Sequence, residues 1–85
     1  MSYEVVFARS ASRELQRLEK NLARRLLERI EALSQDPRPH GSLKLTGRQD
    51  LWRIRSGEYR VVYRIDDNGR LIDVIAVRHR RDAYQ

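Results

Sequence analysis

The sequence predicts an α+β fold of order β-α-α-β-β-β, in which a small antiparallel sheet packs on a helical hairpin. In the first half of the chain, apolar residues recur every three to four positions, which is the period of a helix. From Leu51 onward the period changes to two, as in a strand with one buried face. The 85 residues are expected to form one domain, residues 1–85, because a chain this short cannot fill two separate cores.

The first half of the chain predicts one short strand followed by two helices. Tyr3 to Phe7 carries β-branched and aromatic residues, so we expect a buried first strand there. Ser10 or Ser12 can cap the first helix, and Asn21 marks the expected break between the helices. The second helix should end before Pro37, because proline disfavours a helix just ahead of it. The two apolar stripes consist of Ala11, Leu15, Leu18 and Leu22, and of Leu22, Leu26, Leu27, Ile30 and Leu33.

The second half predicts an antiparallel meander of three strands joined by two turns. The expected strands are Leu51 to Arg55, Tyr59 to Ile65 and Leu71 to Val77, with a lead-in at residues 43–45 that runs into a turn at residues 46–47. A sheet of three or four strands should therefore pack one face on the helices. The residues expected at or near the core are Trp52, Ile54, Tyr63 and Leu26.

Basic residues share one face of this predicted sheet. Period two places Arg53 and Arg55 opposite in direction to Trp52, and the following turn should bring Arg55 and Arg60 across from each other. Like charges in that position repel unless an anion lies among them. A formal net charge of +6 also favours polyanionic partners. The alternative is an ordinary solvated sheet face, because exposed sheets often carry charge.

The end of the chain adds a basic cluster followed by an aromatic ring. Arg78, His79, Arg80 and Arg81 follow the last apolar run, and Tyr84 comes soon after them. Guanidinium groups bind phosphate as forked donors and a ring stacks on a base, which is the chemistry of a single-stranded nucleic-acid site. The pattern gains weight from its proximity to the basic face of the sheet.

The composition disfavours several other classes of protein. The chain has no cysteine, so disulfides, thiolate nucleophiles and cysteine-bound metals are excluded. No signal-peptide pattern and no apolar run of about 20 residues occurs, so we expect a cytoplasmic protein without a membrane span. We expect no metal and no cofactor, because His40 and His79 are far apart, and Asp66 and Asp67 lie in a turn where local hydrogen bonds explain them.

Metal-free cleavage suits RNA, because RNA carries its own nucleophile in the 2′-hydroxyl. A protein then needs only to orient that group, neutralise the phosphate and move two protons. Arginine binds the phosphate well but does not lose a proton under protein conditions, so it is a poor general base. The candidates for proton transfer are His79 and Lys44, the lysine only with a strongly perturbed pKa.

Three segments resemble the strand motifs of RelE-family toxins of type II toxin–antitoxin systems. They are residues 51–55 (LWRIR), 58–63 (EYRVVY) and 77–84 (VRHRRDAY), and the resemblance spans essentially the whole chain, including the paired helices and Lys44. The Tyr-Arg-x-x-Tyr strand is shared across the wider RelE/ParE superfamily and therefore identifies the fold. The His-Arg-Arg-Asp-x-Tyr ending is more informative about activity.

The resemblance implies a metal-independent endoribonuclease that cleaves messenger RNA in the ribosomal A site. It also implies a RelB-like antitoxin that inhibits the toxin within a hetero-oligomer. By resemblance, Arg53 and Arg55 are the basic pair of their strand, Arg60 contacts phosphate, Arg80 is associated with leaving-group protonation, and Tyr84 stacks on a base.

Two further features qualify the predicted site. Family members often carry lysine at the positions of Arg53 and Arg55, so the arginines here favour His79 for proton transfer. Lys44, Arg78 and Arg81 are expected to bind RNA around the catalytic residues, which are expected to be Arg53, Arg55, Arg60, His79, Arg80 and Tyr84.

Two other functions remain open at this point. ParE-like relatives share the fold and poison DNA gyrase, which needs no nuclease site, although Arg80 together with Tyr84 argues against that function. The third possibility is an RNA-binding module without catalysis.

Overall fold

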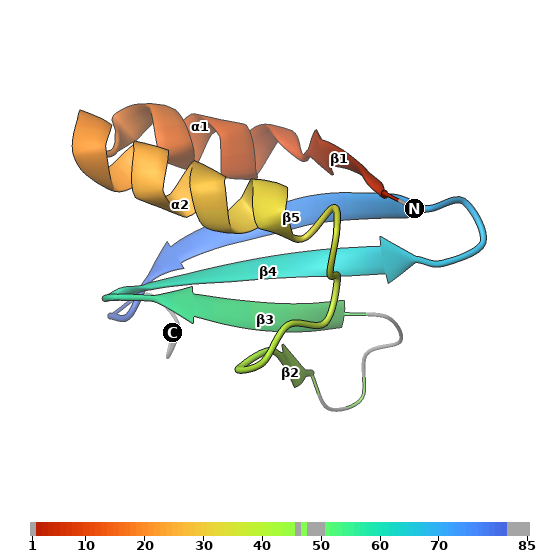
Figure 1. Cartoon of the computed structure of the whole chain (residues 1–85). Coiled ribbons are helices and arrows are strands. Elements are labelled where there is room, and N and C mark those ends of the chain that lie inside the picture. Colours follow the sequence, from red (N-terminus) through yellow and green to blue (C-terminus); the bar gives the residue numbers. More distant parts are fainter. Residues whose placement is uncertain (1, 46, 48–50, 82–85) are drawn as a thin grey trace.

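A computed structural model describes residues 2–45, 47 and 51–81 (Figure 1). In this part of the chain two helices lie on one face of a five-stranded sheet of order β1-β5-β4-β3-β2. The α+β class and the predicted order of one strand, two helices and a three-stranded meander are confirmed. The elements are β1 (Glu4–Phe7), α1 (Arg9–Arg17), α2 (Lys20–Ala32), β2 (Leu43–Lys44), β3 (Leu51–Ser56), β4 (Tyr59–Asp66) and β5 (Leu71–His79).

The sheet differs from the prediction in three respects. β1 pairs in parallel with β5, so the sheet is mixed rather than wholly antiparallel. β1 is also an edge strand, in which the two middle residues are half-buried and the two outer residues are exposed. The expectation of a buried first strand was therefore wrong. β2 adds a fifth strand against β3 where only a lead-in to a turn was predicted. A two-residue strand is too short to show alternation, and periodicity does not reveal strand direction.

The start of α1 differs from the predicted serine cap. The helix begins directly after Ala8, which is its N-cap residue, so Ser10 lies within the first turn. The Ser10 hydroxyl instead donates a hydrogen bond of 3.1 Å to the carbonyl of Ile75 in β5. This serine therefore ties the helix to the sheet.

The break between the helices falls at Glu19, two residues before the predicted position at Asn21. The Glu19 carboxylate accepts hydrogen bonds from the backbone N–H groups of Asn21 and Leu22 at 3.1 and 3.2 Å. These bonds satisfy free donors at the start of α2 and lower the pKa of Glu19. A glutamate cap is less common than a serine or aspartate cap, which is why the pattern did not indicate it.

The core lies between the helices and one face of the sheet. Ile54, Tyr63 and Leu26 are at most 1% exposed, as predicted, and Trp52 packs against the same cluster while remaining half-buried. The opposite face of the sheet, here called the open face, has neither α1 nor α2 against it (Figure 1). The full set of buried apolar residues is Ala11, Leu15, Leu26, Ile30, Leu33, Ile54, Val61, Tyr63, Ile65, Ile72, Val74 and Val77.

Candidate functional site

Three arginines form a row across the open face at one end of the sheet. Arg55 of β3 pairs with Arg60 of β4, and Arg60 pairs with Arg78 of β5. Directly paired residues of antiparallel strands point to the same face, with Cβ atoms about 4.5–5.5 Å apart. The predicted juxtaposition of Arg55 and Arg60 is confirmed. We call Arg55, Arg60 and Arg78 the arginine row.

Arg78 joins the row because β5 is longer than predicted. The strand was expected to end at Val77, with the basic cluster in a tail beyond it, but it continues to His79. Two residues of the cluster, Arg78 and His79, are therefore each assigned to a face of the sheet. Arg78 points to the open face with Arg60, and His79 pairs with Tyr59 on the face that carries the helices.

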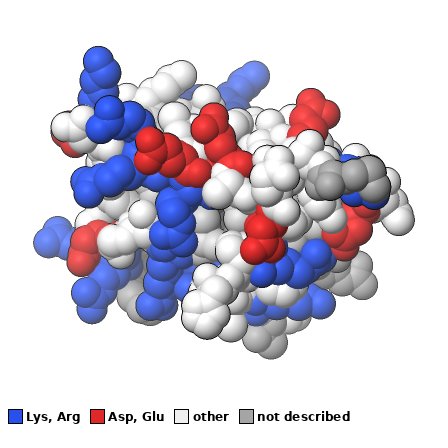
Figure 2. Space-filling view, in the orientation of Figure 1, with Lys and Arg blue, Asp and Glu red and all other residues white. Residues whose placement is uncertain are grey.

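Charge is distributed unevenly along the open face. Next to the arginine row, Arg53 lies between the apolar residues Leu43 and Val62. One row further on, Arg64 pairs with Asp73, and the Arg64 Nη2 and Asp73 Oδ2 atoms are 3.8 Å apart. Positive charge therefore accumulates toward the β3–β4 turn. In Figure 2 most of the blue surface lies at that end of the molecule, on the left of the view.

The β3–β4 turn brings Arg80 to the arginine row. Ser56 pairs with Tyr59, and the positive φ of 60° at Gly57 fits a two-residue turn of type II′. The backbone N–H of Arg80 donates a hydrogen bond of 2.7 Å to the carbonyl of Glu58. An open hollow of about 200 Å³ results, lined by Arg55, Gly57, Glu58, Tyr59, Arg60 and Arg80. Three of the predicted catalytic residues thus line one hollow.

His79 reaches the same region from the other face of the sheet. Its ring contacts the Tyr59 ring edge-on, with centroids 5.1 Å apart and planes at 88°. The Nδ1 atom of His79 accepts a hydrogen bond of 3.1 Å from the backbone N–H of Arg81. A second hollow lies here, and it shares Glu58 and Arg80 with the first. Its lining consists of Glu58, His79, Arg80 and Arg81.

One other predicted site residue, Lys44, is not brought to the arginine row. Lys44 pairs with Trp52, whose side chain packs on the core, so the lysine lies on the helix-bearing side of the sheet. Tyr84 lies outside the described residues. The role of Tyr84 in base stacking therefore stays a prediction.

Glu58 is a component of this region that the sequence prediction missed. It was assigned only to a turn, yet it lines both hollows. The signal was present in the spacing, because a two-residue turn between Arg55 and Arg60 necessarily places Glu58 beside both strand ends.

A different set of interactions holds the opposite end of the sheet. Asp67, in the β4–β5 turn, binds Arg38 through Nη2 at 2.9 Å and Nη1 at 3.3 Å. Asp67 also accepts a hydrogen bond of 2.7 Å from the Tyr3 hydroxyl. We call Arg38, Asp67 and Tyr3 the linker clamp. The expectation of purely local bonding holds for Asp66, which accepts from the Gly69 N–H at 3.1 Å, but not for Asp67.

The linker clamp orders the segment between α2 and β2. The Arg38 guanidinium carbon lies 5.2 Å from the centre of the Trp52 ring, a cation–π distance. The hydrogen bond from Arg38 lowers the pKa of Asp67, and the bond to Asp67 raises the pKa of Tyr3. Nearby, the buried Tyr63 hydroxyl donates to the Pro37 carbonyl at 2.7 Å, and burial raises the pKa of Tyr63 to about 12.

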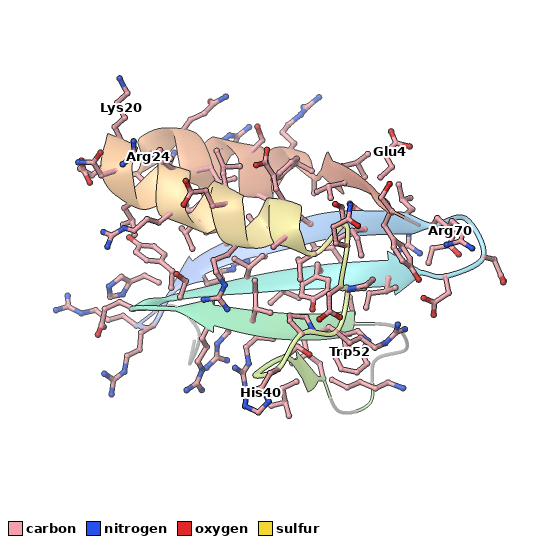
Figure 3. The ribbon with its side chains drawn as sticks, in the orientation of Figure 1. Glu4, Lys20, Arg24, His40, Trp52 and Arg70 are labelled. Atoms are coloured by element: carbon pink, nitrogen blue, oxygen red, sulfur yellow. The ribbon has the colours of Figure 1, made fainter. Side chains whose placement is uncertain are left out.

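The linker clamp and the β3–β4 turn lie at opposite ends of the sheet (Figure 3). Trp52 and Arg70 project at the clamp end, whereas Lys20 and Arg24 project from the start of α2 at the end that holds the β3–β4 turn. Among residues 2–45, 47 and 51–81, no group of three or more His, Asp or Glu side chains is placed to hold a metal ion. No helix within those residues is long and apolar enough to cross a membrane.

Comparisons with known proteins identify the class to which this fold and its basic face belong. A family model, the ParE toxin of type II toxin–antitoxin systems, matches residues 5–84. Toxin RelE of Mycobacterium tuberculosis is 32% identical, over 98% of this chain and 87% of that protein. A putative RelE-like toxin protein of Escherichia coli is 33% identical, over 99% of this chain and 92% of that protein.

A solved structure agrees with the sequence comparisons. The RelE–RelB complex from the archaeon Pyrococcus horikoshii contains a chain that superimposes with a TM-score of 0.80 at 33% identity. The match covers 94% of this chain and 97% of that chain. The chain therefore belongs to the RelE/ParE superfamily of toxins of type II toxin–antitoxin systems, as its strand motifs predicted.

Proposed function

We propose that this toxin is a ribosome-dependent, metal-independent endoribonuclease that cleaves messenger RNA and so inhibits translation. The observation that carries the proposal is the convergence of Arg55, Arg60 and Arg80 on one hollow beside the arginine row. Guanidinium groups held around a phosphate stabilise the charge that develops on it during cleavage. An arrangement of this kind suits RNA, whose 2′-hydroxyl supplies the nucleophile.

In this proposal each site residue has its own role in binding or cleaving the RNA. Arg55, Arg60 and Arg80 hold the scissile phosphate, and the Arg80 guanidinium lies toward the leaving oxygen. His79 holds a proton at Nε2, because its Nδ1 accepts from Arg81. Other residues bind the flanking RNA. These are Arg53, Arg78 and Arg81 for phosphates, Tyr84 for a base, and Lys44 for RNA that passes the edge of the sheet.

The proposed partners are a RelB-like antitoxin, the ribosome and messenger RNA. Because translation takes place in the cytoplasm, we propose that the toxin acts there. The archaeal relative was crystallised as a RelE–RelB complex. An unrestrained message-cleaving enzyme would stop the growth of its host, so an antitoxin that covers or distorts the site is required. Expression of the chain alone should arrest growing cells, and co-expression with the neighbouring reading frame should relieve the arrest. Unimpaired growth with confirmed wild-type sequence would count against the proposal.

Inhibition of DNA gyrase is the second candidate, because the matching family model is named for ParE. One experiment separates the two targets. Primer extension on messages from cells that express the toxin should show cuts within translated regions, while gyrase supercoiling activity in the presence of the toxin stays normal. Intact messages with inhibited gyrase would favour the ParE-like function, and RNA binding without cuts would favour a non-catalytic module.

A further inference from the structure

We infer that Glu58 is the general base of the cleavage reaction, in place of the histidine and lysine that the sequence offers. This inference rests on the proposed function and names the group that removes the proton from the 2′-hydroxyl. It follows from what lines the hollow, how the turn holds Glu58, and which proton His79 carries.

The first step concerns the residues that line the two hollows beside the arginine row. Arginine remains protonated and cannot act as the base. Lys44 lies on the helix-bearing side of the sheet, away from the arginine row. Among the described residues that line the hollows, Glu58 is the one carboxylate, and it borders both. A carboxylate can accept a proton directly.

The second step concerns how firmly Glu58 is held. It occupies the second position of a two-residue turn, whose first position needs the positive φ that Gly57 adopts. Its carbonyl accepts the 2.7 Å hydrogen bond from the Arg80 N–H, which ties the turn to the end of β5. The turn and this hydrogen bond therefore fix the backbone of Glu58 relative to Arg60 and Arg80, two of the arginines that would hold the phosphate. Its exposed side chain borders the hollow in which the phosphate would lie.

The third step concerns His79. Because its Nδ1 accepts from the backbone N–H of Arg81, the neutral ring carries its proton on Nε2. In this arrangement neither ring nitrogen offers a free lone pair to a 2′-hydroxyl. His79 can donate a hydrogen bond from Nε2, and Tyr59 supports the ring from the side. The hydrogen-bond geometry makes His79 a hydrogen-bond donor that positions the RNA. It does not make His79 the general base of the reaction.

A Glu58 carboxylate oxygen takes the proton of the 2′-hydroxyl, the O2′–P bond forms, and the P–O5′ bond breaks. The leaving 5′-oxygen takes a proton from water, to which the hollow is open, and the hydroxide that forms takes up the proton from Glu58, which restores the carboxylate. The arginines hold the negative charge on the phosphate oxygens. The products are a 2′,3′-cyclic phosphate and a 5′-hydroxyl.

The test compares single-turnover cleavage on programmed ribosomes by the wild type and by Glu58→Gln. General base catalysis contributes roughly 10²–10⁴-fold, so the variant should lose that factor while binding the ribosome normally. The matched control is Glu28→Gln, which removes the same charge from the exposed surface of α2 and should cleave at the wild-type rate. Glu58→Asp keeps a carboxylate and should recover part of the rate.

The direction of the change in the cleavage rate distinguishes a general base from a residue with a purely electrostatic role. If Glu58 only balanced the charge of the arginines, its removal would strengthen RNA binding and leave cleavage equal or faster. A message with a sulfur in place of the scissile 5′-oxygen separates a base from an acid, because a thiolate leaves without protonation. The loss in Glu58→Gln should persist on this substrate.

Two results would overturn the inference. One is cleavage by Glu58→Gln within about threefold of the wild type, and the other is a loss that disappears on the 5′-thio message. In both cases the wild type still cleaves, so the proposed function survives. If the wild type itself does not cleave programmed messages, the proposed function fails and the role of Glu58 fails with it.

Discussion

The two ends of this sheet use the same residue type in opposite ways. At the clamp end, Arg38 is bound by Asp67, and Arg64 faces Asp73 within 3.8 Å. At the other end, Arg55, Arg60 and Arg78 face one another across three strands, and Arg80 lies beside them. Opposite charges that pair stabilise the folded chain, whereas like charges that face each other oppose folding.

In the proposed function, this difference separates the end of the sheet that binds RNA from the end that ion pairs hold together. Arginines that have acidic partners connect the linker and the last two strands to each other. Like charges placed opposite each other repel, and a polyanion bound among them relieves that repulsion. The comparison can be tested by changing arginines at each end and measuring both cleavage and stability.

The largest effect is expected from Arg60 and Arg80. Replacing either with alanine removes a preorganised donor to the phosphate, so single-turnover cleavage should fall by roughly 10²–10³-fold. Ribosome binding should be retained, because other basic residues contribute to it. The matched control is Arg64→Ala, four residues from Arg60 along β4, whose side chain faces Asp73 instead. An equal loss in Arg64→Ala would mean that the two ends do not differ in function.

Tyr84 should have the next largest effect on cleavage. Stacking of a base on an aromatic side chain contributes about 1–3 kcal/mol, which corresponds to roughly 5- to 150-fold. Tyr84→Ala should therefore weaken cleavage by a factor in that range, and Tyr84→Phe should be milder because it keeps the ring. If both variants lose the same large factor, the hydroxyl takes part in the reaction and stacking is not the main role.

The arginine row should destabilise the free protein. A like-charge pair directly across two strands opposes folding by about 0.2–1 kcal/mol. Arg55→Gln or Arg78→Gln should therefore raise the melting temperature, by at most about 4–8 °C in a chain of this size. Sulfate should stabilise the wild type more than these variants. A lower melting temperature in both variants would show that repulsion within the arginine row does not destabilise the folded protein.

The smallest effect is expected at the linker clamp, and it should depend on pH. The pKa of Asp67 is lowered in the folded chain, so its stabilisation is present above the ordinary carboxyl pKa and is lost as the pH falls through the folded pKa. Asp67→Asn should lower the melting temperature slightly at neutral pH and less in acid. Salt should weaken the effect, because the clamp is exposed. A difference from the wild type that is the same at all pH values would contradict this role.

The sequence predicted the parts of the fold that repeat along the chain. The alternation of Trp52 and Ile54 with Arg53 and Arg55 gave the correct faces of β3, and the apolar stripes gave the two helices. It did not predict the parallel pairing of β1 with β5, because the two strands lie at opposite ends of the chain and no local pattern relates them. The helix break was misplaced because Glu19, rather than a serine or asparagine, caps α2.

The candidate site was predictable only in part, for a similar reason. Arg55 and Arg60 are close in sequence across a short turn, so period and turn length placed them correctly. Arg80 and Glu58 meet through a backbone hydrogen bond between segments 22 residues apart in number, which no local pattern indicates. The same applies to Asp67, whose partners Tyr3 and Arg38 lie far away along the chain.

The most direct test of the central claim is a reconstituted cleavage assay with purified toxin and ribosomes that carry a defined message. We expect cuts within the codon in the A site, with a 2′,3′-cyclic phosphate and a 5′-hydroxyl at the new ends, and no cuts in the same message without ribosomes. Uncut messages with folded wild-type toxin would contradict the claim that the arginine end of the sheet is a site of RNA cleavage.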